Sequence, residues 1–228
     1  YSKWRGINRF LALAKVFEMI KEKAELADQR EVVPDFSSLL QWIGAGTKLS
    51  NESLAKVATE GDSFLNQVLD WSKKVNEGIA TSEEEIVAFS GVEESLKKAQ
   101  NFADIVVISS ANSEALNKEW NELGLAAYVK EIAGQEMGTK THCIAMAKEG
   151  TYGNDQVLMV GDALGDLEAA RNNGISFYPI IPGKESMSWS RFYQEAFDKF
   201  IQGKYAGEYE KKVTQEFTMV LSDSRIEA

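Results

Sequence analysis

A strand, a tight turn and a helix follow one another directly between Val157 and Ala170. The first four residues of this stretch are apolar, and Gly161 ends the run. Leu164, Leu167 and Ala170 then recur at helical spacing. A short apolar run of this kind is typical of a strand buried in a parallel sheet. The stretch therefore predicts an α/β fold with a ligand site at the carboxyl end of this strand.

Two aspartates follow that strand. Asp162 is the first residue past it, and Asp166 comes four residues later, on the first turn of the helix. Two carboxylates so close together raise each other's pKa unless a cation sits between them, and carboxylate oxygens suit Mg²⁺. The alternative is that Asp162 caps the helix and Asp166 interacts with the helix dipole.

Composition limits the kinds of partner. Twenty-five Lys and Arg residues against 35 Asp and Glu residues give a formal net charge of −10, and no basic run offsets it, so nucleic acid and anionic membranes are not expected partners. Cys143 is the only cysteine, which indicates a reducing compartment. No apolar stretch reaches the roughly 18 to 20 residues of a membrane span, and charged residues break the N-terminal apolar region. We expect a cytoplasmic monomer or homodimer.

The chain divides into two regions of different character. Residues 1–88 show helical periodicity with little strand signal, whereas residues 89–228 alternate apolar runs with helical patterns. Strands separated by helices predict a Rossmann-like core with a mainly parallel sheet. We therefore expect an all-helical domain over residues 1–88 and an α/β core domain over residues 89–228.

The expected elements are these. In the first region we expect one helix over about 4–26 and others around 39–43, 54–58 and 64–69, with Asp62 capping the last and a capping box at Ser82 and Glu85. In the second region a capping box at Ser90 and Glu93 begins a helix. Strands are expected over 105–108, 126–132, 157–160 and 175–181, and helices from 113, over 140–148, from 164, over 187–202 and over 205–221. The last two segments are rich in aromatic residues that we expect to pack on the core.

Two serines, Ser109 and Ser110, end the predicted strand 105–108. A hydroxyl there, together with backbone N–H groups of the turn and of the next helix, makes a site for an anion the size of phosphate. A turn in which Asn112 or Ser113 caps the helix explains the same residues equally well.

Lys140 lies at the start of the predicted helix 140–148. A lysine at a helix N-terminus opposes the helix dipole, so its position favours a functional contact with an anion. A solvated surface lysine is the alternative.

A serine at a strand end, a lysine that begins a helix and Gly-Asp-x-x-x-Asp at a later strand end, in this order, resemble the haloacid dehalogenase (HAD) superfamily, within it the phosphoglycolate-phosphatase-like members with a helical cap. The resemblance covers residues 89–181 by motifs, and the whole chain if the helical region is the cap. It implies a magnesium-dependent phosphatase acting on a small phosphorylated metabolite. Ser109 and Ser110 would bind the phosphoryl group, Lys140 would hold its charge, and Asp162 and Asp166 would bind Mg²⁺, with Asp166 bound directly or through water.

The chain departs from the family in its first motif. The family's Asp-x-Asp, which supplies the nucleophile, occurs nowhere in the 228 residues. In the family the cap follows the strand that carries this motif, so we expect the nucleophile in a segment before Tyr1, and we expect the 228 residues alone to be inactive. A non-catalytic module that binds an anion and a metal, and a phosphomutase, are the alternatives.

Trp4, Arg5 and Arg9 would follow directly after that segment. They would then face the substrate. Pairing with the acidic surface of the protein is the alternative for the two arginines.

Overall fold

The computed structural model describes residues 4–26, 33–58, 62–81 and 86–222. The chain splits into two compact units, Ile7–Glu85, here called the helical unit, and Tyr1–Gly6 with Ile86–Ala228, here called the core unit. We predicted a single boundary at residue 88. The division at residue 85 lies close to it, but the first six residues belong with the core unit, which sequence periodicity did not indicate.

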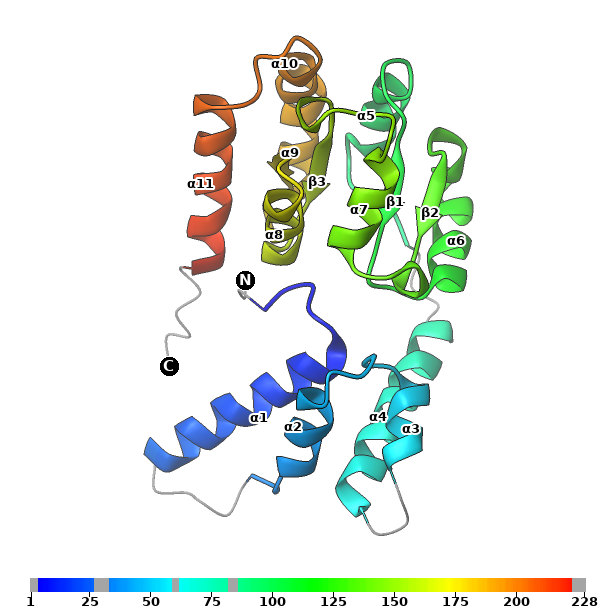
Figure 1. Ribbon diagram of the computed structural model, residues 1–228, viewed down its shortest axis with the longest axis vertical. Helices are drawn as coiled ribbons and strands as arrows, with labels where there is room; N and C mark the ends of the chain where they lie inside the picture. Colours follow the sequence, from blue (N-terminus) through cyan, green and yellow to red (C-terminus); the bar gives the residue numbers. More distant parts are fainter. Residues whose placement is uncertain (1–3, 27–32, 59–61, 82–85, 223–228) are drawn as a thin grey trace. The chain divides into compact units, whose positions relative to one another are not determined.

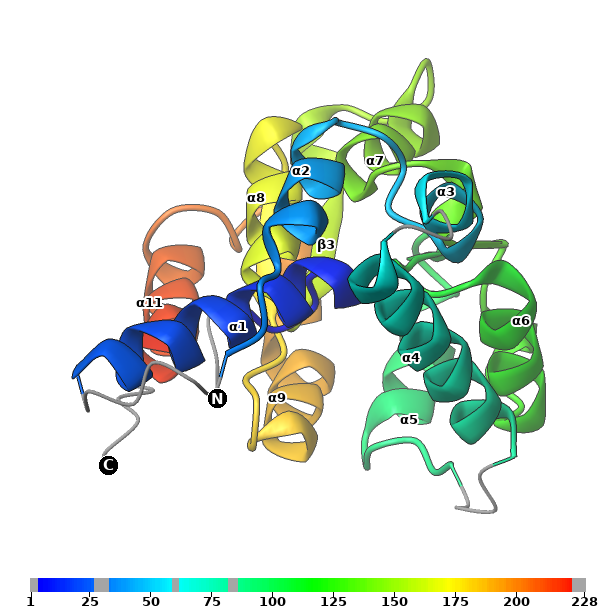
Figure 2. The ribbon, with the colours of Figure 1, turned by 90° about the horizontal axis from the view of Figure 1, so that it is seen from below.

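The helical unit contains α1 (Arg9–Leu26), α2 (Ser37–Gly44), α3 (Asn51–Val57) and α4 (Ser63–Ala80), which can be followed from blue to teal in Figure 2. Side chains cap α3 and α4, because the Ser50 hydroxyl accepts a bond from the Ser53 amide and the Asp62 carboxylate accepts one from the Leu65 amide. The cap at Asp62 confirms the prediction. The first helix begins at Arg9, five residues later than expected.

The core of the helical unit is made by one face of each helix. Phe10, Leu39, Trp42 and Leu54 are buried in it, and the rings of Phe10 and Trp42 meet edge to face at 5.0 Å between centroids. Ile20 of α1 lies outside this core and is 41% exposed.

The core unit alternates strands with helices (Figure 1). Its strands are β1 (Val106–Ile108), β2 (Glu131–Ala133), β3 (Leu158–Gly161) and β4 (Ser176–Pro179). Its helices are α5 (Val92–Ala99), α6 (Ser113–Glu122), α7 (Lys140–Lys148), α8 (Leu164–Asn172), α9 (Glu185–Arg191), α10 (Phe197–Ile201) and α11 (Glu208–Ser222), with a π-helical turn over Phe192–Ala196 and short 3₁₀ turns at Ala126–Tyr128, Gln135–Met137 and Asn154–Gln156. This mixed α/β architecture confirms the predicted fold class.

The strands pair in parallel, as predicted. Val107 lies opposite Ile132 in the pair β1–β2, and Met159 lies opposite Phe177 in the pair β3–β4. Over the described residues the two pairs are separate two-stranded sheets. The expected parallel pairing is therefore present, in two separate sheets.

Burial differs between the strands. Phe177 and Tyr178 of β4 are 1% and 0% exposed, whereas the residues of β1 and β3 are only half-buried although they are apolar. Ile108 of β1 and Met159 of β3 pack against one core cluster, while Leu158 and Val160 of β3 pack against another on the other face. Strand β3 is therefore covered on both faces, and β1 shares one of the two clusters with it.

One predicted helix cap differs from the structure. Helix α5 begins after Gly91, whose φ of 90° lies in the left-handed region, and no side chain caps it, so the capping box at Ser90 and Glu93 is wrong. The other predicted capping box, at 82–85, lies outside the described residues. The aromatic C-terminal segments pack on the core as expected, with Tyr205 and Phe217 buried. In the described part of the chain, no helix combines the length and the apolar character needed to span a bilayer.

Candidate functional site

The turn after β3 is shaped by the side chain of Asp166. A Cβ atom added to Gly161 would lie 2.5 Å from the Cβ and from the Oδ2 atom of Asp166, a separation that real atoms do not show. Gly161 is thus required because Asp166, at the first turn of α8, folds back over the end of the strand. The spacing of Gly-Asp-x-x-x-Asp follows from this packing.

Both carboxylate oxygens of Asp166 are used within the protein. Its Oδ2 atom accepts bonds from the amides of Asp162 and Ala163, each at 3.0 Å, and its Oδ1 atom accepts a bond from the Lys140 ammonium. The side chain is 2% exposed. Asp166 therefore fixes the turn and holds Lys140, and each of its two oxygens already accepts at least one hydrogen bond. Contact through water, one of the two forms we predicted, is compatible with these bonds.

Lys140 is placed by the start of α7. Thr139 caps this helix by accepting a bond from the His142 amide, so Lys140 is the first helical residue. Its position opposes the helix dipole, and the charge of Asp166 compensates for this. With its side chain 22% exposed and paired to a buried carboxylate, Lys140 is not the solvated surface lysine of the alternative interpretation.

Asp162 is the more accessible carboxylate of the two. Its side chain is 42% exposed, and its Oδ2 atom accepts bonds from Arg5, from Nε at 2.7 Å and from Nη2 at 2.6 Å. The N-cap position of α8 is Ala163, so Asp162 does not cap the helix as the alternative interpretation proposed. Arg5 therefore pairs with an acidic residue, and that residue is the predicted metal ligand.

Gly6, the residue after Arg5, also contacts the turn after β3. Gly6 has a φ of +74°, and a Cβ atom added to it would lie 2.8 Å from the Cβ of Ala163. The backbone at Gly6 therefore lies directly against the turn after β3. This contact and the Arg5 ion pair explain why residues 4–6 belong to the core unit.

Ser109 and Ser110 occupy the loop after β1. The Ser109 amide continues the pairing with β2 by donating to the Ala133 carbonyl at 2.9 Å, and the Ser109 hydroxyl accepts a bond from the Ala111 amide at 3.1 Å. The hydroxyl proton of Ser109 is then left to donate to a bound anion, since this oxygen acts as acceptor toward Ala111. Ser110 is exposed.

The first turn of α6 is occupied by other side chains. The Asn112 side chain caps the helix by accepting bonds from the amides of Glu114 and Ala115. Glu136 accepts a bond from the Ser113 amide at 3.0 Å and from the Ser113 hydroxyl at 2.5 Å. The helix amides that we included in the predicted anion site are therefore in use, and Asn112 is the cap, as the alternative for this stretch proposed.

The bonds made by Ser113 have an electrostatic consequence for Glu136. They lower the pKa of the Glu136 carboxyl from 4.5 to about 2, with the Ser113 hydroxyl as the largest cause. Glu136 lies in the loop after β2, and Ser113 follows the loop after β1. Their hydrogen bonds therefore connect the two loops. Sequence reasoning missed it, although an acidic residue two positions after the Gly134 that allows this close packing was a usable signal.

The structure brings together Arg5, Lys140, Asp162 and Asp166. Over the described residues, no hydrogen bond or ion pair joins Ser109 or Ser110 to these four, although α7 contacts both β1 and α8. In the same part of the chain, no group of three or more His, Cys, Asp or Glu side chains is arranged to hold a metal.

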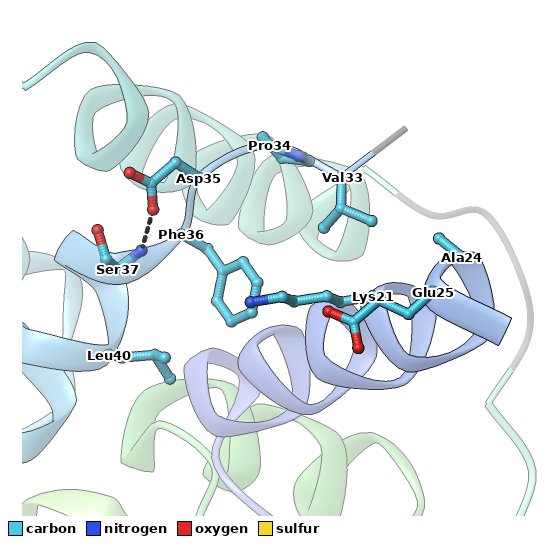
Figure 3. A pocket seen from close by; sticks show the side chains of 9 residues that line it. All are labelled: Lys21, Ala24, Glu25, Val33, Pro34, Asp35, Phe36, Ser37 and Leu40. Atoms are coloured by element: carbon cyan, nitrogen blue, oxygen red, sulfur yellow. Dashed lines mark hydrogen bonds between the residues drawn. The ribbon is translucent and has the colours of Figure 1, made fainter. Parts of the chain in front are cut away.

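A cavity of about 410 Å³ opens in the helical unit beside the ring of Phe36, between α1 and the start of α2 (Figure 3). Its lining residues are Lys21, Ala24, Glu25, Val33, Pro34, Asp35, Phe36, Ser37 and Leu40. It contains none of the predicted site residues.

Comparison with known proteins gives one family. The model of the haloacid dehalogenase-like hydrolases matches residues 19–180, which is more than half of the chain and includes Lys140, Asp162 and Asp166. Neither the curated proteins nor the solved structures contain a significant match. The order of the motifs, the parallel strand pairs and this match lead to one conclusion: the chain belongs to the haloacid dehalogenase-like hydrolase family.

Proposed function

We propose that this protein is a magnesium-dependent phosphatase that hydrolyses a small phosphorylated metabolite through an aspartyl-phosphate intermediate. The observation that carries the proposal is the Lys140–Asp166 pair beside Asp162, because it holds an ammonium group and a more exposed carboxylate together at the end of β3. A cation and a carboxylate that can bind a metal are the groups that phosphoryl transfer requires.

The residues present fit Mg²⁺ in part. Asp162 offers a half-exposed carboxylate, and Mg²⁺ in proteins usually takes one or two carboxylates and keeps several waters. Asp166 is expected to orient one of those waters, because its oxygens already bind Lys140 and two amides. When bound, the metal would neutralise charge on the transferring phosphoryl group.

The remaining roles belong to residues of this chain. Lys140 keeps its ammonium group in place through Asp166 and is proposed to contact the phosphoryl oxygens with its other protons. Ser109 donates its hydroxyl proton to one of these oxygens, and the exposed Ser110 completes the loop around them. The helical unit is proposed to act as the cap that selects the substrate and excludes water.

The nucleophile is proposed to lie on a further strand, encoded before Tyr1, between β1 and β3. Over the described residues, β1 pairs with β2 alone and β3 pairs with β4 alone, which leaves one edge of each without a partner strand. The apolar residues of both strands are only half-buried, and unpaired strand edges with half-buried apolar side chains favour insertion of another strand.

The test compares the 228-residue chain with the longer encoded protein, using p-nitrophenyl phosphate and acetyl phosphate as substrates. We expect Mg²⁺-dependent turnover by the longer protein only, with kcat/KM lowered about a hundredfold or more by Asp162→Asn and by Lys140→Met. Lys118→Met, which removes an exposed charge on α6, is the matched control and is expected to retain activity.

Three results would contradict the proposal. Turnover by the 228 residues alone that is lost in Asp162→Asn would place the nucleophile within this chain. An encoded upstream segment without Asp-x-Asp would exclude this mechanism and favour a non-catalytic binding module. Recovery of the phosphoryl group on a second substrate hydroxyl, with no release of free phosphate, would identify a phosphomutase.

A further inference from the structure

The four charged residues at the end of β3 form an electrically balanced cluster. Asp162 and Asp166 carry two negative charges, and Arg5 and Lys140 carry two positive charges, each cation bonded to one carboxylate. A divalent cation that bound Asp162 would enter a cluster whose charges already cancel. The positive charges of Arg5 and Lys140 therefore oppose its binding, and they oppose it less when one of these cations moves away from its carboxylate.

The two ion pairs differ in burial. Lys140 and Asp166 are 22% and 2% exposed, so separating them would leave a buried charge without a partner. Arg5 and Asp162 are 37% and 42% exposed, and ion pairs of that exposure contribute little to stability. Arg5 is thus the cation that gives way more easily.

The bonds of Arg5 are also directed at one oxygen. Both Nε and Nη2 donate to Oδ2 of Asp162, and the arrangement is not the parallel two-oxygen fork that makes Arg–carboxylate pairs strong. The backbone at Gly6 packs on Ala163, so the chain keeps Arg5 near Asp162 even when the guanidinium leaves the carboxylate. Arg5 is placed to compete with a metal ion and to return when the ion departs.

From these observations we propose that Arg5 is an internal counter-ion that competes with a divalent cation for Asp162 and so sets the metal affinity of the site. This inference rests on the proposed function in that it takes Asp162 as the metal ligand. In this role Arg5 changes the affinity of Asp162 for the metal and does not contact the substrate.

The experiment measures divalent cation binding directly. The 228-residue chain is titrated with Mn²⁺, the free ion is followed by electron paramagnetic resonance, and Mg²⁺ is then added as competitor. Arg5→Gln is expected to bind about threefold to tenfold more tightly than the wild type, since a neighbouring positive charge is removed. Raising the salt concentration should reduce this difference by screening.

Two further variants separate charge from structure. Arg5→Lys keeps the charge and should stay closer to the wild type than Arg5→Gln does. Arg9→Gln removes the same charge from the helical unit, where Arg9 bonds to Ser72 and Asn76, and should leave Mn²⁺ affinity unchanged.

The outcomes distinguish this inference from the proposed function. Binding that is lost in Asp162→Asn but unchanged or weakened in Arg5→Gln would overturn the inference and keep the metal site. Binding that is the same in Asp162→Asn as in the wild type would overturn the metal site itself, and the inference with it. An equal gain in Arg9→Gln would show that overall charge, and not Arg5, sets the affinity.

Discussion

At the scale of single residues, the site is held by one close approach that only glycine permits. Gly161 lies beneath the Asp166 side chain, so the strand can end there and the carboxylate can reach the amides of Asp162 and Ala163. The position of Asp162 depends on this turn. The glycine of the motif is therefore as necessary as its two aspartates.

Two glycines of this motif should respond in opposite ways to the same substitution. Gly161→Ala is expected to destabilise the protein by about 1–3 kcal/mol, because the added methyl group displaces Asp166. Gly165→Ala is expected to stabilise it by about 0.5–1 kcal/mol, because Gly165 lies within α8 and a Cβ atom there meets nothing within 4 Å. Urea denaturation of both variants measures the change in unfolding free energy. Equal destabilisation by both would contradict the packing explanation.

At the scale of elements, Glu136 joins the loops after β1 and β2 through a carboxylate at the N-terminus of α6. Its hydrogen bonds with Ser113 lower its pKa to about 2, so the folded state holds the ionised form more strongly than the unfolded chain does. This contribution to stability is fully present above pH 4.5, the ordinary value for glutamate, and is lost as the pH falls through about 2.

The pH dependence gives a prediction for this loop. Glu136→Gln should have a lower melting temperature than the wild type at neutral pH, and the difference should shrink as the pH falls from about 4.5 to about 2. Glu131→Gln, which changes the same charge on the exposed first residue of β2, is the control and should show no such trend. Differential scanning calorimetry across this pH range provides the measurement. If the difference in melting temperature between Glu136→Gln and the wild type does not change with pH, ionised Glu136 is not the source of this stability.

Local patterns predicted most elements, since helical spacing and short apolar runs are properties of neighbouring residues. They correctly predicted α7, β3 and the cap at Asp62. They failed where the outcome depends on backbone conformation or on distant residues. Gly91 replaces the expected cap of α5 with a left-handed turn. The hydrogen bonding of Asp166 depends on Lys140, which is 26 positions away in the sequence. The contact of Arg5 with the core unit depends on Asp162, which is 157 positions away.

At the scale of the whole molecule, each unit has a hydrophobic core of its own. The core of the helical unit is made by α1 to α4 and includes Leu54, which is 0% exposed. The clusters of the core unit are made by residues after position 91, among them Leu167, which is 6% exposed. No buried cluster of the described residues draws on both units. Units with separate cores are expected to open separately.

This separation is tested with two equal truncations. Leu54→Ala and Leu167→Ala each remove a buried side chain and are expected to cost about 2–5 kcal/mol in the unit that contains them. Hydrogen exchange measured by mass spectrometry should show Leu54→Ala reducing protection in α1–α4 while β3, β4 and α11 keep theirs, and Leu167→Ala should give the reverse. If either variant lowers protection equally in both units, the chain unfolds as one cooperative structure. In that case substitutions in the helical unit would alter the geometry around Asp162 and Lys140 as well, and this unit, which we propose as the cap, could not vary independently of the core unit.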